Sequence, residues 1–392
     1  MMLSKNKKLA YELSSISVFG DIFKNECMST LLSFLEEEDT YKKVKLYARF
    51  VQLLSKEGGN LAHLVRKLCF EDENEYIKTL ARGCTPSDTL AENVTAELSL
   101  LSYLSHLDKE ELTCEMDYDG YLASFDNERI YLSSEYTERA VNISRYGYGI
   151  FAHNIMFRLD GDAIIPIEAS DKISIDNFIG YSEERQKVYD NTVALIEGRP
   201  AANILLCGDA GTGKSSTVKA VANELSCRGV RLIELRKDQL TQLPAVMGRI
   251  ARNPLKFIIF VDDLSFNKND DCFSMLKAAL EGSASAKADN AVIYATSNRR
   301  HIVKETFADR GDDDIHRQDT VQELMSLSER FGLVVYFSKP SKKLYLEIVH
   351  ALASKAGIDM EALELDIKAE AYALAKGNRS PRAAEQFVKS LL

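Results

Sequence analysis

The sequence predicts an α/β protein in which a parallel β-sheet is preceded and followed by helical segments. Three observations support this fold class. Apolar runs alternate with helical segments through the middle of the chain, a glycine-rich loop separates the first run from the next helix, and residues 1 to about 140 show helical periodicity. Alternating strands and helices are typical of a parallel sheet that is covered by helices on both faces.

Five short apolar runs are the expected strands of this sheet. They occupy residues 203–207, 230–235, 256–261, 291–296 and 333–337. Each run is long enough for one strand, and a segment with helical character separates it from the next. We therefore expect residues 173–339 to form a three-layer α/β/α domain around a five-stranded parallel sheet.

Residues 1–145 are expected to form a mainly helical N-terminal domain. Residues 40–56 carry an apolar stripe at helical spacing, formed by Val44, Tyr47, Ala48, Val51 and Leu54. Residues 87–107 begin with two candidate N-cap residues, Ser87 and Asp88, and then repeat leucine at helical intervals. We interpret both stripes as the core faces of a small helical bundle.

Two further segments flank the predicted α/β domain. Residues 146–172 contain strand-like runs on either side of "LDGD" (159–162), which is typical of a hairpin, and we expect them to connect the two domains. Residues 340–392 are expected to form a C-terminal helical lid. Two of its helical segments end at Gly357 and Gly377, and a third begins near Ser380 and Pro381.

The composition excludes several classes of protein. The 392 residues carry a net charge of −10, which disfavours a broad nucleic-acid-binding face but leaves room for a local basic patch. No window approaches the run of about 18 apolar residues that a transmembrane helix needs, so we expect no membrane partner. The seven cysteines are scattered without a C-x-x-C pair. This pattern favours reduced thiols and a cytoplasmic location.

A phosphate-binding loop (P-loop) is predicted directly after the first strand. The segment "GDAGTGKS" has the spacing G-x-x-x-x-G-K-S, and it lies between an expected strand and an expected helix. Its glycines let backbone N–H groups converge on phosphates, and the helix adds the positive end of its dipole. Lys214 is expected to reach the β- and γ-phosphates of a nucleotide, and Ser215 to bind Mg²⁺. The predicted loop comprises Gly208, Asp209, Ala210, Gly211, Thr212, Gly213, Lys214, Ser215 and Ser216.

Two adjacent carboxylates end the third strand, in "FIIFVDDLSF" (257–266). Asp262 is expected to hold Mg²⁺ as the Walker B acid, and Asp263 to polarise the attacking water. The alternative is that both residues cap the next helix or face solvent. Many nucleotide-hydrolysing enzymes have glutamate at the second position, and an aspartate carboxylate reaches about 1.5 Å less far. Either the backbone at Asp263 lies closer to the attacking water, or ATP hydrolysis is slow.

A second acidic segment has a different interpretation. Residues 307–320 include Asp312, Asp313, Asp314 and His316, a set that could suggest a metal site. We interpret the segment as a solvated acidic loop that caps the following helix.

Further polar residues follow the P-loop and the paired aspartates in a recognisable order. Asn298 ends the fourth strand, Arg330 precedes the fifth strand, and Arg379 and Arg382 lie at the final helix. This set, in this order, resembles the AAA+ ATPases. The resemblance implies that Asn298 is sensor 1, that Arg330 is a finger given to the ATP of a neighbouring subunit, and that Arg382 is sensor 2, with Arg379 as the alternative. The alternatives without a catalytic role are that Asn298 simply ends its strand and that Arg330 forms a surface ion pair.

The same resemblance implies a base pocket and a set of catalytic residues. The segment 175–192 looks like the entry to the adenine pocket of the family, with Phe178, Ile179 and Gly180 near the base. The catalytic residues implied are Lys214, Asp263, Asn298, Arg330 and Arg382.

A closer resemblance covers residues 165–392. The segments "LLCGDAGTGKSSTVKA", "FVDDLSF", "ATSNRRH" and "SERFGL" together resemble an uncharacterised bacterial family of predicted AAA+ ATPases, a domain of unknown function. This resemblance implies ATP and Mg²⁺ as ligands and a homo-oligomeric ring of about six subunits.

The sequence defines less well which process the hydrolysis of ATP would drive. The segment 235–250 has no aromatic residue, which argues against a threading unfoldase. We expect an enzyme that remodels or loads a partner macromolecule, with a protein partner held by the N-terminal domain. One alternative is an ATP-dependent binding switch that hydrolyses slowly. Another is a nucleic-acid-associated ATPase that uses the basic segments 298–301 and 338–343.

Overall fold

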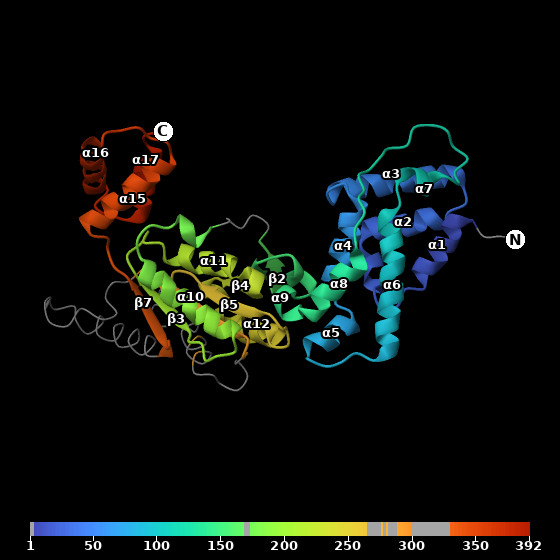
Figure 1. The fold of residues 1–392 in the computed structure, drawn as a ribbon, viewed down its shortest axis with the longest axis horizontal. Helices are drawn as coiled ribbons and strands as arrows, with labels where there is room; N and C mark the ends of the chain where they lie inside the picture. Colours follow the sequence, from blue (N-terminus) through green and yellow to red (C-terminus); the bar gives the residue numbers. More distant parts are fainter. Residues whose placement is uncertain (1–3, 168–172, 265–275, 277–279, 281–287, 299–329) are drawn as a thin grey trace. The chain divides into compact units, whose positions relative to one another are not determined.

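A computed structural model describes residues 4–167, 173–264, 276, 280, 288–298 and 330–392. The chain divides into two compact units, Met1–His153 and Asn154–Leu392 (Figure 1). The division falls inside the segment 146–172 that we expected to be a connection. The acidic segment 307–320 and most of the basic segment 298–301 lie outside the described residues.

The first unit is helical, as the periodicity predicts. Its α-helices are α1 (Lys5–Ser14), α2 (Glu26–Glu36), α3 (Thr40–Lys56), α4 (Leu61–Glu71), α5 (Glu75–Ala81), α6 (Asp88–His106), α7 (Lys109–Thr113), α8 (Leu132–Val141) and α9 (Ile143–Tyr146). Two short 3₁₀ segments, η1 (Gly20–Lys24) and η2 (Gly149–Ala152), complete it. Ser87 caps α6 by accepting the N–H of Leu90.

The buried face of α3 differs slightly from the predicted stripe. Tyr47, Val51 and Leu54 are buried as expected, but Ala48 is exposed. Phe50 is fully buried on α3 and packs its ring against that of Phe125. The helix is therefore rotated towards its larger side chains, because burying a phenylalanine removes far more apolar area from water than burying an alanine.

The second unit is built on one mixed sheet. Its strands are β1 (Met156–Asp160), β2 (Ala163–Pro166), β3 (Ile204–Gly208), β4 (Val230–Leu235), β5 (Lys256–Val261), β6 (Ala291–Ser297) and β7 (Leu333–Phe337). All five predicted strands form and are mutually parallel, in the order β4-β5-β6-β3-β7. Within the described residues the sheet has seven strands rather than the expected five, because the hairpin of β1 and β2 extends it.

The additional strands cover one edge of the predicted sheet. β1 pairs in parallel with β4, and β2 pairs antiparallel with β1. An uncovered edge strand leaves a row of N–H and C=O groups without partners, and the hairpin satisfies those of β4. The sequence indicates the hairpin itself but not its docking, because no local pattern specifies which distant strand a hairpin joins.

Buried side chains lie on both faces of the sheet. On one face α10 (Ser182–Ile196) and α11 (Lys214–Glu224) pack through Val188, Val218 and Val221 against β5 and β6. The alternate residues of the strands, which point to the opposite face, are buried as well. This burial on both sides is the three-layer arrangement that parallel strands require. The remaining segments are α12 (Leu243–Ile250), η3 (Ile175–Asn177), η4 (Ser226–Arg228) and η5 (Lys237–Gln242).

Three helices at the C-terminus have an apolar cluster of their own. They are α15 (Lys342–Lys355), α16 (Ala362–Ala375) and α17 (Pro381–Lys389). The cluster is centred on buried Tyr345, Val349 and Phe387. Ser380 caps α17 by accepting the N–H of Ala383, so the predicted start of this helix is confirmed. We call α15 to α17 the lid.

No helix in the described part of the chain is long and apolar enough to cross a membrane.

Candidate nucleotide-binding site

The predicted P-loop joins the carboxyl end of β3 to the amino end of α11. Gly208 has φ +143°, and a Cβ at this position would lie 2.1 Å from the backbone oxygen of Phe337 on β7. Gly211 has φ +79°, and a Cβ there would lie 3.0 Å from Cβ of Arg382 in the lid. These close approaches explain why glycine is required, and they position the loop between the sheet and the lid.

A cavity of about 980 Å³ lies at this loop. Most of the predicted site residues line it: Phe178, Ile179, Ala210, Gly211, Thr212, Gly213, Lys214, Ser215, Ser216, Asp262, Asp263, Asn298 and Arg382. The carboxyl ends of parallel strands meet at one edge of a sheet, and this is where ligands bind in such folds. Gly180 and Asp209 each adjoin a lining residue in the chain, and Gly208 precedes Asp209. Neither Gly208 nor Arg330 lines the cavity.

The ammonium group of Lys214 is buried and has three hydrogen-bond acceptors. Nζ donates to the backbone oxygen of Gly208 at 2.8 Å, to that of Asp209 at 2.7 Å and to Oδ1 of Asn298 at 2.9 Å. Burial lowers the pKa of Lys214 from 10.5, and nearby carboxylates, led by Asp209, oppose this effect. The lysine therefore lies at the base of the loop, in contact with Asn298, the residue that follows β6.

Asp262 accepts two short hydrogen bonds through Oδ1. Ser215 donates to this atom at 2.6 Å, and Thr296 donates to it at 2.6 Å. The serine of the P-loop and the acid of the third predicted strand are thus in direct contact. Thr296 was missed by our sequence interpretation, although it is a polar residue inside the apolar run of β6 and is 2% exposed. A buried hydroxyl in such a strand needs a partner, and this need is the signal that could have identified it.

Asp263 adopts a left-handed backbone conformation, with φ +53°. Its N–H donates to the hydroxyl oxygen of Thr296 at 2.9 Å, and its Oδ1 accepts from Nδ2 of Asn298 at 2.8 Å. Aspartate tolerates this conformation better than most other residues. The direction of the Asp263 carboxylate is therefore determined by a backbone turn that Thr296 stabilises, and not by side-chain length alone.

Asn298 connects the two sides of the site. Its Oδ1 accepts from Lys214, and its Nδ2 donates to Asp263. A single amide thereby joins the P-loop lysine to the second acid. This arrangement is more specific than that of a residue which merely ends its strand, and it supports the sensor interpretation of Asn298.

The two lid arginines have different environments. Arg382 lines the cavity, and its backbone N–H donates to the oxygen of Gly211 at 3.3 Å. Arg379 forms a two-pronged ion pair with Glu370 on α16, at 3.0 and 2.8 Å. This pair raises the pKa of Arg379 and lowers that of Glu370. The geometry favours Arg382 as the arginine that contacts a nucleotide.

The other end of the cavity is largely apolar. Phe178 and Ile179 line it together with Ile348 and Leu352 of α15. Gly180 has φ +73°, and a Cβ there would lie 2.6 Å from Cδ1 of Leu344, so glycine lets the lid approach the core. The buried Arg185 also lines this end. It was missed because a single arginine early in an amphipathic helix has no distinctive pattern.

Arg330 lies near the amino end of β7. Because Phe337, at the carboxyl end of this strand, pairs with Gly208, the rise of about 3.3 Å per residue places Arg330 on the order of 15 Å from the P-loop edge. This distance is too great for the side chain to reach the same subunit's cavity.

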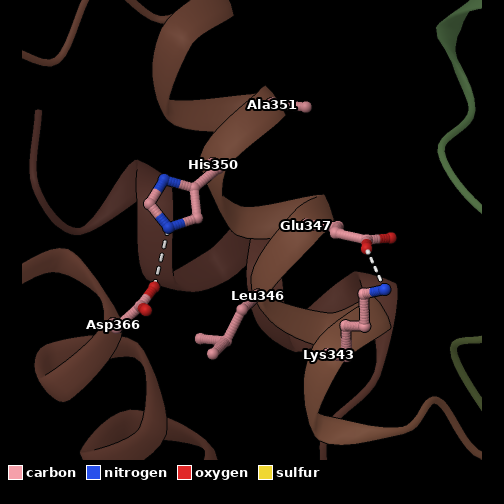
Figure 2. A pocket seen from close by; sticks show the side chains of 6 residues that line it. All are labelled: Lys343, Leu346, Glu347, His350, Ala351 and Asp366. Atoms are coloured by element: carbon pink, nitrogen blue, oxygen red, sulfur yellow. Dashed lines mark hydrogen bonds and ion pairs between the residues drawn. The ribbon is translucent and has the colours of Figure 1, made fainter. Parts of the chain in front are cut away.

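A second hollow lies on the lid surface between α15 and α16 (Figure 2). Its charged groups are paired with each other: His350 Nε2 lies 2.7 Å from Asp366 Oδ1, and Lys343 lies 4.0 Å from Glu347. Among the residues that the structure describes, no group of three metal-binding side chains was found. We therefore restrict the candidate site to the cavity at the P-loop.

The donor set at the P-loop fits a nucleotide with Mg²⁺. Ser215 and Asp262 already converge at 2.6 Å, and they offer the hydroxyl and carboxylate oxygens that this hard cation prefers. The loop glycines leave room that a Cβ would fill, and α11 begins directly after Gly213. A phosphate group is stabilised at such a helix N-terminus.

The strand order, the P-loop after β3, the two acids after β5 and the helical lid define a P-loop fold of the AAA+ class. Residues 152–392 match the family described as "Protein of unknown function (DUF815)". The chain belongs to this family.

Solved structures of similar fold include two of RuvB from Thermotoga maritima. A RuvB variant shares 18% identity with a TM-score of 0.39, and the RuvB Holliday junction branch migration motor shares 17% with a TM-score of 0.37. Both alignments cover 55% of this chain and 63% of the RuvB chain, which is less than two thirds of its length.

A structure reported for katanin self-assembly shares 16% identity with a TM-score of 0.33, covering 55% of this chain and 69% of that one. No curated protein sequence matches the chain.

Proposed function

We propose that this protein is an ATPase that binds ATP with Mg²⁺ at the P-loop cavity and hydrolyses it. The observation that carries the proposal is the hydrogen-bonded chain from Lys214 through Asn298 to Asp263, beside the contact between Ser215 and Asp262. A phosphate-binding lysine, a metal-binding pair and a candidate base thus share one cavity.

Ser215 and Asp262 would hold Mg²⁺. When bound, this ion neutralises charge on the β- and γ-phosphates. Thr296 positions Asp262 for this role through its hydroxyl group. Lys214 exchanges at least one of its three present acceptors for phosphate oxygens, and Arg382 approaches the phosphates from the lid.

Asp263 and Asn298 would act on the attacking water. The carboxylate of Asp263 accepts a hydrogen bond from the water and orients its oxygen towards the γ-phosphorus. A bond forms between the water oxygen and the γ-phosphorus as the bond to the β,γ-bridging oxygen breaks, ADP leaves, and the proton of the water passes to the carboxylate of Asp263. Asn298 keeps the acid in place by donating to it. Such positioning supplies most of the catalysis in phosphoryl transfer, because the protein has little covalent chemistry to perform.

Arg330 would complete the site of a neighbouring copy in a ring. Its position beyond the reach of its own cavity supports this trans role, and an arginine finger contributes about 10³–10⁵ in rate. We further propose that the ring remodels or loads a partner held by the N-terminal unit.

The test measures ATP binding and turnover in four proteins. The wild type binds ATP with Mg²⁺ and hydrolyses it, Asp263→Asn binds without turnover, and Lys214→Ala and Arg330→Ala are each inactive. A mixture of the last two recovers turnover, because a Lys214→Ala subunit still supplies Arg330 to a neighbour with an intact P-loop.

Three results would change parts of this proposal. Wild-type binding without turnover would replace the ATPase by an ATP-dependent switch. Full activity of Arg330→Ala alone would show that Arg330 is not an arginine finger acting in trans. Turnover that rises with DNA, together with salt-dependent DNA binding, would favour a nucleic-acid-associated ATPase.

A further inference from the structure

A buried guanidinium group lies at the apolar end of the nucleotide cavity. Arg185 belongs to the first turn of α10 and is 8% exposed, yet it lines the cavity. It lies outside both the P-loop and the acidic pair. Charged side chains are almost never fully buried without partners, so this position requires an explanation.

The described part of the chain provides the guanidinium group of Arg185 with few partners. Its guanidinium lies 5.4 Å from the centroid of the Phe178 ring, within cation–π distance. Within the described residues, the one hydrogen bond of the guanidinium runs to the backbone oxygen of Phe178 at 3.5 Å, longer than a normal N–H···O bond. A guanidinium has five N–H donors. By contrast, each donor of Lys214 has an acceptor at 2.9 Å or less.

The surroundings of Arg185 fit a flat aromatic ligand. Phe178, Ile179, Ile348 and Leu352 form apolar walls. Lys355 also lines the cavity, but its ammonium donates to Oδ1 of Asn177 at 2.7 Å. Burial lowers the pKa of Arg185, but an arginine keeps its charge at neutral pH. This end of the cavity therefore combines an apolar slot with a charged donor that lacks a close acceptor among the residues that the structure describes.

We propose that Arg185 determines base specificity by donating a hydrogen bond to a ring nitrogen of a purine. This inference rests on the proposed function, since it assigns a role within the same nucleotide site. A purine ring enters the apolar slot, and one of its ring nitrogens accepts from the guanidinium. A buried donor of this kind rejects a base that lacks the acceptor, because the donor would remain unpaired.

The experiment compares ADP with 1-deaza-, 3-deaza- and 7-deaza-ADP by titration calorimetry on the full chain. Each analogue replaces one ring nitrogen by C–H. Diphosphates are used because the proposed ATPase would hydrolyse a triphosphate during the measurement. The wild type binds one of the three analogues about tenfold or more weakly than ADP, because a charge-assisted hydrogen bond is lost. In Arg185→Met that difference disappears, and the variant binds ADP as weakly as the wild type binds the affected analogue.

Two controls isolate the base contact. Pyrophosphate binds the wild type and Arg185→Met equally, which shows an intact P-loop. Arg231→Met removes another buried arginine of this unit, one that donates to backbone oxygens of Ser226 and Val230 and does not line the cavity. It leaves the discrimination between ADP and its analogues unchanged. Arg185→Leu is the second variant if Arg185→Met does not fold.

Two results would overturn the inference. The wild type could bind all three analogues as well as ADP. Alternatively, the discrimination could persist in Arg185→Met, with ADP and every analogue weakened by the same factor, which would show that Arg185 only supports Phe178. A folded wild type that binds neither ADP nor pyrophosphate would instead refute the proposed function itself.

Discussion

The buried hydroxyl of Thr296 donates a 2.6 Å hydrogen bond to Oδ1 of Asp262. The same hydroxyl oxygen accepts the N–H of Asp263 at 2.9 Å, so one side chain on β6 positions both acids that follow β5. In the proposed ATPase, these acids bind the metal ion and orient the water. Thr296 is therefore a positioning residue for the site.

Replacing Thr296 by valine keeps the shape of the side chain but removes both hydrogen bonds. We expect kcat to fall by about tenfold or more, because small misplacements of catalytic groups have effects of this size. ATP affinity in the absence of Mg²⁺ should change little. Steady-state kinetics and equilibrium binding check this prediction.

Two controls separate positioning from stability. Thr296→Ser keeps the hydroxyl and should restore most of kcat. Thr192→Val removes another buried hydroxyl, which bonds to Tyr294 on the same strand and does not line the cavity. If Thr192→Val lowers kcat as much as Thr296→Val does, the positioning role is wrong.

Asp263→Glu tests whether the second acid is too short. The residue has φ +53°, a conformation that costs glutamate roughly 1 kcal/mol more than it costs aspartate. The longer side chain would also displace the contact with Asn298. We therefore expect turnover to fall, by about tenfold. A strong rise in turnover would show instead that the native aspartate does not reach the water.

Substitution of the two lid arginines should give different results. Arg382→Ala removes a cavity-lining guanidinium, and we expect ATP turnover to fall by about 10- to 100-fold. Arg379→Ala breaks the ion pair with Glu370 and should lower the thermal stability of the lid without changing ATP affinity. Turnover assays and calorimetric Tm values distinguish the two. A reversed result would assign the nucleotide contact to Arg379.

The N-terminal unit contains an acid that should make stability depend on pH. Burial raises the pKa of Asp72 from 3.8 to about 6, although Asn74 donates to it at 2.8 Å. Between these pH values the folded state binds more protons than the unfolded state, so this residue destabilises the fold increasingly as pH rises. Asp72→Asn should be as stable as the wild type near pH 4. Above pH 6 it should be more stable, by at most roughly 3 kcal/mol.

Calorimetric Tm values of the full chain, taken at intervals from pH 4 to pH 7, check this dependence. The exposed Asp119 provides a matched control, and Asp119→Asn should show no such change. If Asp72→Asn differs from the wild type in stability by the same amount at both ends of the pH range, the raised pKa of Asp72 is contradicted.

Local patterns predicted much of the fold. The five parallel strands, the helical first unit and the starts of α6 and α17 all follow from periodicity and capping residues within short windows. The docking of the hairpin beside β4 did not follow, because pairing between distant strands is specified by packing rather than by local spacing. The exposure of Ala48 has a similar cause, since the rotation of a helix depends on its neighbours.

The sequence by itself determined the parts of the site that are contiguous. The P-loop is one segment with a fixed spacing, and Asp262 and Asp263 end a strand that any parallel sheet would bring to the same edge. Only the tertiary structure decided which side chains from separate segments meet there. It brought Thr296 to the acids, Arg382 rather than Arg379 to the cavity, and Arg185 to its apolar end. These contacts depend on packing between helices and strands far apart in the chain, which no local pattern records.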